Sequence, residues 1–301
     1  MREITTIAAL RSELDHERSS GATVGLVPTM GFLHDGHASL IRRAASENDV
    51  VVVSVYVNPL QFAANEDLGA YPRDLDGDRA AASVAGAQLL FLPEAREMVP
   101  AAMATTVTVT GVSEGMEGSS RPSHFAGVAT IVTKLFAIAG PCRAYFGEKD
   151  FQQLAVIATM ARDLALPVEV IGCEIVREPD GLARSSRNVY LTPLERAAAP
   201  AIHRALLAGQ RVLSETSERN ATVHSVLDTV RQALDEEPLI DLEYVELVDP
   251  VTLSPVIELD RPARLCVAAR LGRARLIDNL AISPPSGFGD QLDASTCGTS
   301  T

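Results

Sequence analysis

Two histidines three residues apart stand in residues 28–37, PTMGFLHDGH, between an apolar run and a helical pattern. This context places His34 and His37 at the amino end of a helix, nearly on one face. Backbone N–H groups and the positive pole of the helix dipole favour anions there, and Gly36 lets a bulky ligand approach the backbone. With 6 His and 20 Gly in 301 residues, about 0.008 HxGH motifs are expected by chance in a chain of this composition. The segment predicts a site for a nucleoside triphosphate.

A second segment, FGEKDFQQ over residues 146–153, also stands where an apolar run meets a helical pattern. Gly147 permits close approach of a ligand, and Lys149 supplies a point charge suited to phosphate oxygens. Asp150 and Gln153 fall one helical turn apart and would hold a hydroxyl of a sugar or a substrate. A solvated helix start is the competing interpretation of this segment.

Two further segments bring polar groups to loops. In DGLARSSRN, residues 180–188, Ser185 and Ser186 stand between two guanidinium groups. Such a set forms a phosphate clamp, unless it is an ordinary surface charge cluster. In NPLQF, residues 58–62, an amide side chain at the end of a buried strand would orient a polar substrate. We expect both segments to face a common cleft.

The remaining titratable groups carry weaker signals. His124, in RPSHF, is interpreted as a packed or capping histidine rather than a catalytic one. Three alternating aspartates, Asp74, Asp76 and Asp78, belong to a solvated helix face or help to hold a magnesium ion. The cysteines form no CxxC pair, so neither zinc nor a disulfide framework is indicated; they are Cys142, Cys173, Cys266 and Cys297.

The elements that must position these segments alternate between strand and helix. Residues 50–57 form a nearly continuous β-branched run, as in a strand buried on both faces of a parallel sheet. Helical patterns over 35–45, 74–87, 128–138 and 152–164 are separated by apolar runs at 24–27, 89–92, 144–146 and 168–171. This order predicts a doubly wound, Rossmann-like α/β domain over residues 1–176, with ligands beyond the carboxyl ends of the strands.

The pattern changes from about residue 177. Residues 193–214 and 221–236 are predicted as helices rich in Ala and Leu, and 241–248, 264–269 and 274–277 as short strands. Helices followed by clustered strands favour a smaller α+β domain over residues 177–283; its role as a lid is a separate expectation that the pattern itself does not carry. The tail, 284–301, is rich in Pro, Gly, Ser and Thr, and we expect it to be disordered.

Charge and composition exclude several classes of protein. The chain carries 39 acidic against 26 basic residues, a net charge of −13, and a protein that grips long RNA or DNA needs a basic surface instead. A few basic groups in a cleft still suffice for a small anion. No window reaches 18 uninterrupted apolar residues, and the charged N-terminus is unlike a signal peptide. We therefore expect a cytoplasmic protein that binds metabolites.

Taken in this order, the segments closely resemble the pantoate–β-alanine ligase, or pantothenate synthetase, family. The resemblance runs from about residue 20 to 282 and is most specific in VPTMGFLHDGH, VNPLQF, RPSHFAGVATIVTKLF, FGEKDFQQ and VREPDGLARSSRNVYL. It places the chain in the HxGH nucleotidyltransferase superfamily. It implies that pantoate reacts with ATP, with Mg²⁺ on the phosphates, to give pantoyl adenylate and pyrophosphate. β-Alanine then displaces AMP to give pantothenate, and a homodimer is expected.

The resemblance also assigns roles to residues. His37 would be the proton donor and, with His34, Lys149 and Arg187, would form the catalytic set. Gln61 and Gln153 would bind pantoate, with Gln61 also near β-alanine. The ATP-binding residues implied by the family are Met30, His34, His37, Gly147, Lys149, Asp150, Val176 (through its backbone), Ser185, Ser186 and Arg187.

One position departs from the family pattern, and two other functions stay open. The family usually has Met before the Ser-Ser-Arg-Asn run, where this chain has Arg184, so a cation replaces an apolar contact and would strengthen phosphate binding. One alternative is a nucleotidyltransferase that adenylates another small acceptor, which the glutamines Gln61 and Gln153 disfavour. The other is a fragment of an aminoacyl-tRNA synthetase or a nucleotide-binding regulator, which the acidic charge and the intact histidines disfavour.

Overall fold

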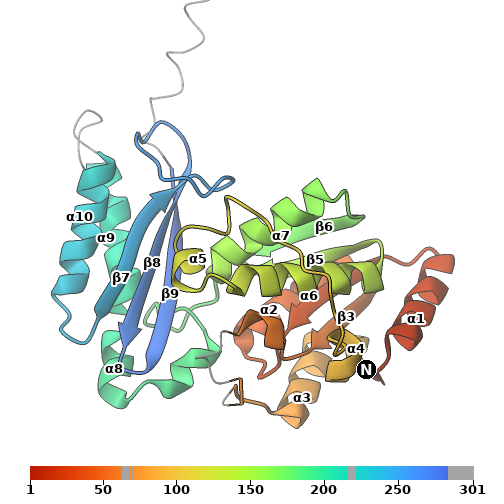
Figure 1. Ribbon diagram of the computed structural model, residues 1–301. Coiled ribbons are helices and arrows are strands. Elements are labelled where there is room, and N and C mark those ends of the chain that lie inside the picture. Colours follow the sequence, from red (N-terminus) through yellow and green to blue (C-terminus); the bar gives the residue numbers. More distant parts are fainter. Residues whose placement is uncertain (63–67, 70, 216–221, 284–301) are drawn as a thin grey trace, which may run out of the picture. The chain divides into compact units, whose positions relative to one another are not determined.

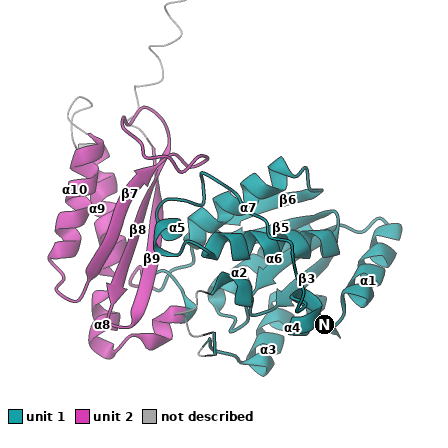
Figure 2. Cartoon of the chain, in the orientation of Figure 1, with its two compact units in different colours: residues 1–178, 183–186 teal, residues 179–182, 187–301 magenta. Residues whose placement is uncertain are grey.

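The computed structural model describes residues 1–62, 68, 69, 71–215 and 222–283. They form two compact units (Figure 2): unit 1 comprises residues 1–178 with 183–186, and unit 2 comprises 179–182 with the chain from 187 onward. The tail predicted to be disordered, 284–301, lies outside the described residues.

Unit 1 is built on a parallel sheet. Its described strands are hydrogen-bonded in the order β1-β4-β3-β2-β5-β6, with every pairing parallel. The strands are β1 (Arg2–Ile4), β2 (Val24–Thr29), β3 (Val50–Val55), β4 (Leu89–Phe91), β5 (Cys142–Gly147) and β6 (Val168–Cys173). Helices connect successive strands, as parallel pairing requires. The predicted α/β fold is confirmed.

The helices of unit 1 cover both faces of this sheet (Figure 1). They are α1 (Ile7–Ser19), α2 (Asp35–Glu47), α3 (Leu75–Ala85), α4 (Ala95–Met98), α5 (Glu117–Ser120), α6 (His124–Ala139) and α7 (Phe151–Asp163), with 3₁₀ turns η1 (Pro59–Gln61) and η2 (Glu148–Asp150). Residues 50–54 of β3 are all buried, so both of its faces are covered. One face packs Val51 and Val53 against Ile41 and Ala44 of α2 and Ala82 of α3.

Unit 2 is a smaller α+β unit, as predicted. Its antiparallel sheet has the order β7-β8-β9, and apolar residues of α9 and α10 share a core with β7, β8 and β9. The elements are η3 (Ser186–Tyr190, whose first residue belongs to unit 1), α8 (Pro193–Ala198), α9 (Ala201–Glu215), α10 (Val223–Asp235), β7 (Asp241–Val248), β8 (Ala263–Leu271) and β9 (Ala274–Ile282).

Two details differ from the sequence-based expectation. The single helix predicted over residues 193–214 is wrong, because α8 and α9 are separate helices that part at Pro200. Proline lacks the N–H that a continuous helix would need there, so Pro200 cannot donate the hydrogen bond that would join the two helices. The strand β1 was not predicted; it is three residues long and carries two charged residues at the sheet edge. Among the described residues, no helix has the length and apolar character needed to cross a membrane.

Candidate active site

The strand order of unit 1 places two of the predicted segments side by side. Strands β2, β3 and β4 follow one another toward one edge of the sheet, and β5 and β6 follow one another toward the other edge. The direction in which successive strands are added therefore reverses between β2 and β5. In open α/β sheets this switch point, beyond the carboxyl ends of the strands, is where ligands bind. The HxGH segment follows β2 directly, and Gly147 ends β5 next to Lys149 and Asp150. The two segments therefore meet at one edge of the sheet.

His34 and His37 are held by hydrogen bonds and by contact between their rings at the start of α2. His34 is the N-cap residue, and its Nδ1 accepts the backbone N–H of Gly36 at 3.1 Å. The backbone N–H of His34 in turn donates to Nδ1 of His37 at 3.3 Å, and the ring centroids lie 4.2 Å apart. Because each Nδ1 accepts a hydrogen bond, each neutral ring carries its proton on Nε2. Both imidazoles are thus held as N–H donors.

The surroundings keep these rings uncharged. The pKa of His37 is lowered from 6.5 to about 3, chiefly by burial and also by the charges of His34 and Lys149, against an opposing effect of Asp150. The pKa of His34 is also lowered, by burial and then by the charge of Lys149, with a smaller contribution from Arg184. At neutral pH the site therefore offers two neutral donors beside a lysine cation. Such a set suits an anion whose charge grows during reaction.

Lys149 and Asp150 follow β5, whereas the two histidines follow β2, the neighbouring strand at the switch point. The Lys149 Nζ lies 3.8 Å from an Asp150 carboxylate oxygen, and the Lys149 side chain is only 15% exposed. The effect of both charges on the His34 and His37 pKa values shows that the structure brings these four predicted residues together. The competing interpretation of this segment as a merely solvated helix start is therefore wrong for Lys149.

Arg184, which replaces the family's usual Met, is held by carboxylates. Its Nη1 lies 2.8 Å from Asp35, the residue that follows His34, and its Nη2 lies 3.2 Å from Glu178. Its backbone N–H donates to the carbonyl of Val176 at 2.9 Å. Two acidic partners offset the charge, so the added cation that the sequence suggested is largely neutralised. The ion pairs instead join Arg184 and Glu178 to the start of α2, all within unit 1.

Gln61 is held from several sides. Asn58, which is 1% exposed, donates to the Gln61 Oε1 at 3.0 Å and to the Gly127 carbonyl at 3.1 Å. The Gln61 backbone carbonyl accepts from Arg121 at 3.3 Å and lies 3.0 Å from Nδ1 of His124. Because Asn58 occupies the amide oxygen, the Gln61 NH₂ group is the part left to face a ligand. His124 is indeed a packed histidine, but it packs against the backbone of a candidate site residue.

The other predicted residues fall into three places. Met30 follows β2, and Gln153 lies in the first turn of α7, both beyond carboxyl ends of strands. Gln152, which precedes Gln153, is buried; its side chain makes hydrogen bonds with backbone groups of Val112, Gly115 and Glu117. Ser185 and Ser186 belong to unit 1, whereas Arg187 belongs to unit 2.

The three aspartates have separate structural roles. Asp74 caps α3 by accepting the Gly77 N–H, and Asp76 pairs with Arg79. Asp78 is 3% exposed, so the solvated-face interpretation is wrong for it. Its two oxygens accept the N–H groups of Phe32 and Leu33 at 3.1 and 2.6 Å. Within the described residues there is no group of three or more His, Cys, Asp or Glu side chains suited to a metal ion.

The sequence analysis named Asp78 but missed its role as a buried acceptor for the loop before His34, although a signal was present. Its side chain shares one face of α3 with the buried residues Ala82 and Ala85, at spacings of four and three. An acidic residue in register with an apolar helix face indicates a buried carboxylate with a specific partner.

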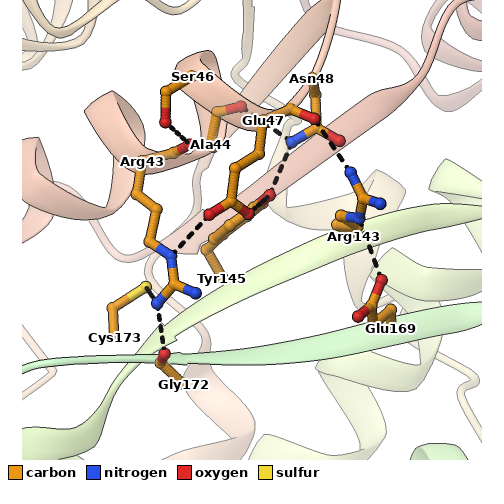
Figure 3. A network of polar contacts seen from close by, with 10 residues as sticks. All are labelled: Arg43, Ala44, Ser46, Glu47, Asn48, Arg143, Tyr145, Glu169, Gly172 and Cys173. Carbon is orange, nitrogen blue, oxygen red and sulfur yellow. Dashed lines mark hydrogen bonds and ion pairs between the residues drawn. The ribbon is translucent and has the colours of Figure 1, made fainter.

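A polar network fixes the other end of α2 to the sheet (Figure 3). The Tyr145 hydroxyl of β5 donates to Glu47 at 2.8 Å and accepts from Asn48 at 2.7 Å. Arg43 joins Glu47 at 3.0 Å and the Gly172 carbonyl of β6 at 2.7 Å. Burial, with the Glu47 hydrogen bond, raises the pKa of Tyr145 to about 12, so the phenol stays protonated. The helix that carries both histidines is thereby anchored to two strands.

Comparison with known proteins identifies the family and the fold. A family model described as pantoate-beta-alanine ligase matches residues 2–281. The chain is 53% identical over 287 residues to a pantothenate synthetase of Rhizobium meliloti, covering 95% of this chain and 98% of the relative. A crystal structure of pantothenate synthetase from Thermus thermophilus matches with a TM-score of 0.88 at 49% identity, covering 94% and 100% of the two chains.

A second solved structure carries ligands. It is a pantoate-beta-alanine ligase from Francisella tularensis, complexed with beta-gamma ATP and beta-alanine, which matches with a TM-score of 0.74 at 31% identity over 93% of this chain and 97% of that one. The sequence motifs, the strand order and these matches all agree. This chain belongs to the pantoate–β-alanine ligase family.

Proposed function

We propose that the switch point of unit 1 is where this ligase activates pantoate with ATP and passes the acyl group to β-alanine. The observation that carries the proposal is the pair of neutral imidazole donors, His34 and His37, beside the Lys149 cation. A nucleoside triphosphate is the ligand whose charge such a set accommodates best. The Francisella tularensis relative, complexed with beta-gamma ATP and beta-alanine, supports the same ligand classes.

In the first step, a carboxylate oxygen of pantoate attacks the α-phosphorus of ATP, and the bond from that phosphorus to the pyrophosphate oxygen breaks. Negative charge grows on the phosphate oxygens, and little covalent chemistry falls to the protein. We assign the Nε2–H groups of His34 and His37 to hydrogen bonds with these oxygens, and Lys149 to their charge. We assign Ser185, Ser186 and Arg187 to the phosphates as well.

In the second step, the amine of β-alanine attacks the acyl carbon of pantoyl adenylate. The carbon–oxygen bond to the phosphate breaks, AMP leaves, and the amine loses a proton to give pantothenate. Gln61 and Gln153 hold pantoate in this scheme, and the fixed orientation of the Gln61 amide supports an NH₂ contact with an anionic or hydroxyl-bearing substrate. Met30, Gly147, Asp150 and the Val176 backbone complete the nucleotide site.

Magnesium enters this scheme with ATP. Mg²⁺ prefers oxygen ligands and commonly binds through substrate phosphates with few protein groups. The described residues offer no preformed cluster, and both Asp78 oxygens accept backbone hydrogen bonds. We therefore propose that the ion is held mainly by the phosphates and neutralises part of their charge.

The test follows AMP and pyrophosphate when purified protein receives ATP, Mg²⁺ and pantoate, with and without β-alanine. Pyrophosphate release should require pantoate, and multiple turnovers of AMP should require β-alanine. His37→Asn should lower pyrophosphate release by about 10²–10³-fold, whereas His16→Asn, an exposed position of α1, should not. Activity with a different small acceptor in place of pantoate would favour the alternative nucleotidyltransferase and refute this assignment.

We also propose that the protein works as a homodimer in the cytoplasm, as the family resemblance implies. Light scattering of the purified protein should give twice the mass of one chain. A concentration-independent monomer that retains full activity would contradict the dimer.

A further inference from the structure

The loop between β2 and α2 contains two consecutive residues in the left-handed region. Gly31 has φ of 83° and Phe32 has φ of 53°. Glycine adopts this region readily, but a bulky aromatic residue does so at a cost, because its Cβ crowds the backbone. The loop that delivers His34 to its capping position therefore needs support from outside its own sequence.

That support comes from one buried carboxylate on a neighbouring helix. Asp78 of α3 accepts the backbone N–H of Phe32 at 3.1 Å through Oδ2 and that of Leu33 at 2.6 Å through Oδ1. Asp78 as a whole residue is 3% exposed. Hydrogen bonds to an ionised acceptor in such a setting are stronger than bonds between neutral groups. Asp78 thus binds the backbone N–H groups of Phe32, which has the left-handed conformation, and of Leu33, which directly precedes His34.

The packing around Gly31 leaves no room for a side chain. A Cβ at this position would lie 2.8 Å from Asp78 Oδ2 and 3.0 Å from Val55 Cγ1. On its other side, the Gly31 N–H donates to the Thr29 hydroxyl at 3.2 Å. The loop is therefore enclosed between the carboxylate and the carboxyl ends of β2 and β3.

An acid is an unfavourable choice here for stability alone. Burial raises the pKa of Asp78, the nearby Asp74 raises it further, and the two backbone N–H groups oppose them. A neutral residue of the same size would avoid the desolvation of a charge. The carboxylate is better explained by the geometry that it imposes on the loop, since two acceptor oxygens of one group meet two successive N–H groups.

We propose that Asp78 is a positioning residue for the adenylation step, acting through the turn at residues 31–33 on the placement of His34 and His37. This inference rests on the proposed function, since it concerns the same two imidazoles. Asp78 contacts the loop backbone and is not itself assigned to the substrate.

The test compares Asp78→Asn with Asp49→Asn. The first keeps the shape but turns an NH₂ group toward one of the two N–H donors. The second is a matched control, because Asp49 also accepts two hydrogen bonds, from the Thr23 N–H and hydroxyl, at the amino end of β3. Pantoate-dependent pyrophosphate release without β-alanine reports adenylation alone. A misplacement of about 1 Å lowers such a rate about 10²-fold, so we expect that loss for Asp78→Asn and less than a twofold change for Asp49→Asn.

A second readout separates positioning from a general loss of folding. In folded Asp78→Asn, the NMR signals of the His34 and His37 rings should shift while those of the other histidines stay in place. Wild-type adenylation by this variant would overturn the proposal, and so would a slower rate with unchanged His34 and His37 signals. Both outcomes leave the proposed function intact if the wild-type chain releases pyrophosphate only with pantoate.

A measurement on the unaltered chain covers the case in which Asp78→Asn does not fold. Amide exchange of Phe32 and Leu33 should be slow, at the level of the buried strand β2, because both N–H groups face a buried carboxylate. Fast exchange at both positions would overturn the proposal whatever the variants do.

Discussion

Gly127 of α6 lies so close to η1 that the smallest substitution should disturb the substrate side of the site. A Cβ at this position would stand 2.1 Å from the Leu60 carbonyl oxygen and 2.6 Å from the Gln61 nitrogen. These are backbone atoms that cannot swing aside. Contacts below 3.0 Å are essentially never seen for Cβ atoms, so η1 and α6 must separate by at least 0.9 Å in Gly127→Ala.

Two effects of this displacement can be given magnitudes. Overpacking of this kind costs about 1–3 kcal/mol of the free energy of unfolding. The shift also carries Gln61 with it and stretches the 3.1 Å hydrogen bond between Asn58 and the Gly127 carbonyl. A displacement of about 1 Å in a substrate-positioning group lowers the rate about 10²-fold. We expect kcat/KM for pantoate to fall by that factor, while the KM for ATP changes little.

Urea unfolding and steady-state kinetics with pantoate as the varied substrate would test this. Gly115→Ala is the matched control, because no heavy atom lies within 4 Å of its added Cβ and its φ is not left-handed. Wild-type stability together with wild-type use of pantoate in Gly127→Ala would refute the argument. A loss confined to ATP would refute the assignment of Gln61.

Three further predictions concern unit 1. The pKa of His37 is lowered from 6.5 to about 3 in the folded chain. As the pH falls, His37 is therefore protonated in the unfolded chain before it is protonated in the folded chain. The contribution of neutral His37 to the free energy of unfolding is full above pH 6.5 and falls toward pH 3 by up to about 1.4 kcal/mol per pH unit. His37→Asn should remove this pH dependence, and an unchanged slope of unfolding free energy against pH in that variant would contradict the argument. Arg184→Met leaves Asp35 unpaired near the proposed phosphates and should raise the KM for ATP several-fold at low salt, an effect that disappears at high salt; a lower KM would contradict it. Tyr145→Phe removes one hydrogen-bond partner each from Glu47 and Asn48 and should cost about 1–3 kcal/mol of unfolding free energy, and unchanged urea unfolding would contradict that.

Much of unit 1 could be predicted because its patterns are local. Residues 50–54 are buried on both faces and are β-branched at four of five positions, so the strand was visible without any partner. The HxGH segment lies between a strand and a helix as expected, which made His34 and His37 identifiable. Edge strand β1 was missed because three residues with two charges carry no periodicity.

Parts of the site depend on contacts that local patterns do not encode. Asp78 meets the loop before His34 across more than 40 residues of chain, and only the register of α3 against that loop makes the contact. The pairing of Arg184 with Asp35 likewise joins a loop to the start of α2, far away in the chain. The sequence suggested an added cation at this position, whereas the folded chain neutralises it. Such pairings follow from the tertiary arrangement of unit 1.

The central claim, transfer of pantoate through an adenylate, is tested most directly by tracing oxygen. Pantoate labelled with ¹⁸O in its carboxylate is turned over with ATP, Mg²⁺ and β-alanine, and the AMP is examined by mass spectrometry. The attack of a carboxylate oxygen on the α-phosphorus predicts that one ¹⁸O atom leaves with each AMP. Unlabelled AMP, or label found in pyrophosphate or in inorganic phosphate, would contradict the account.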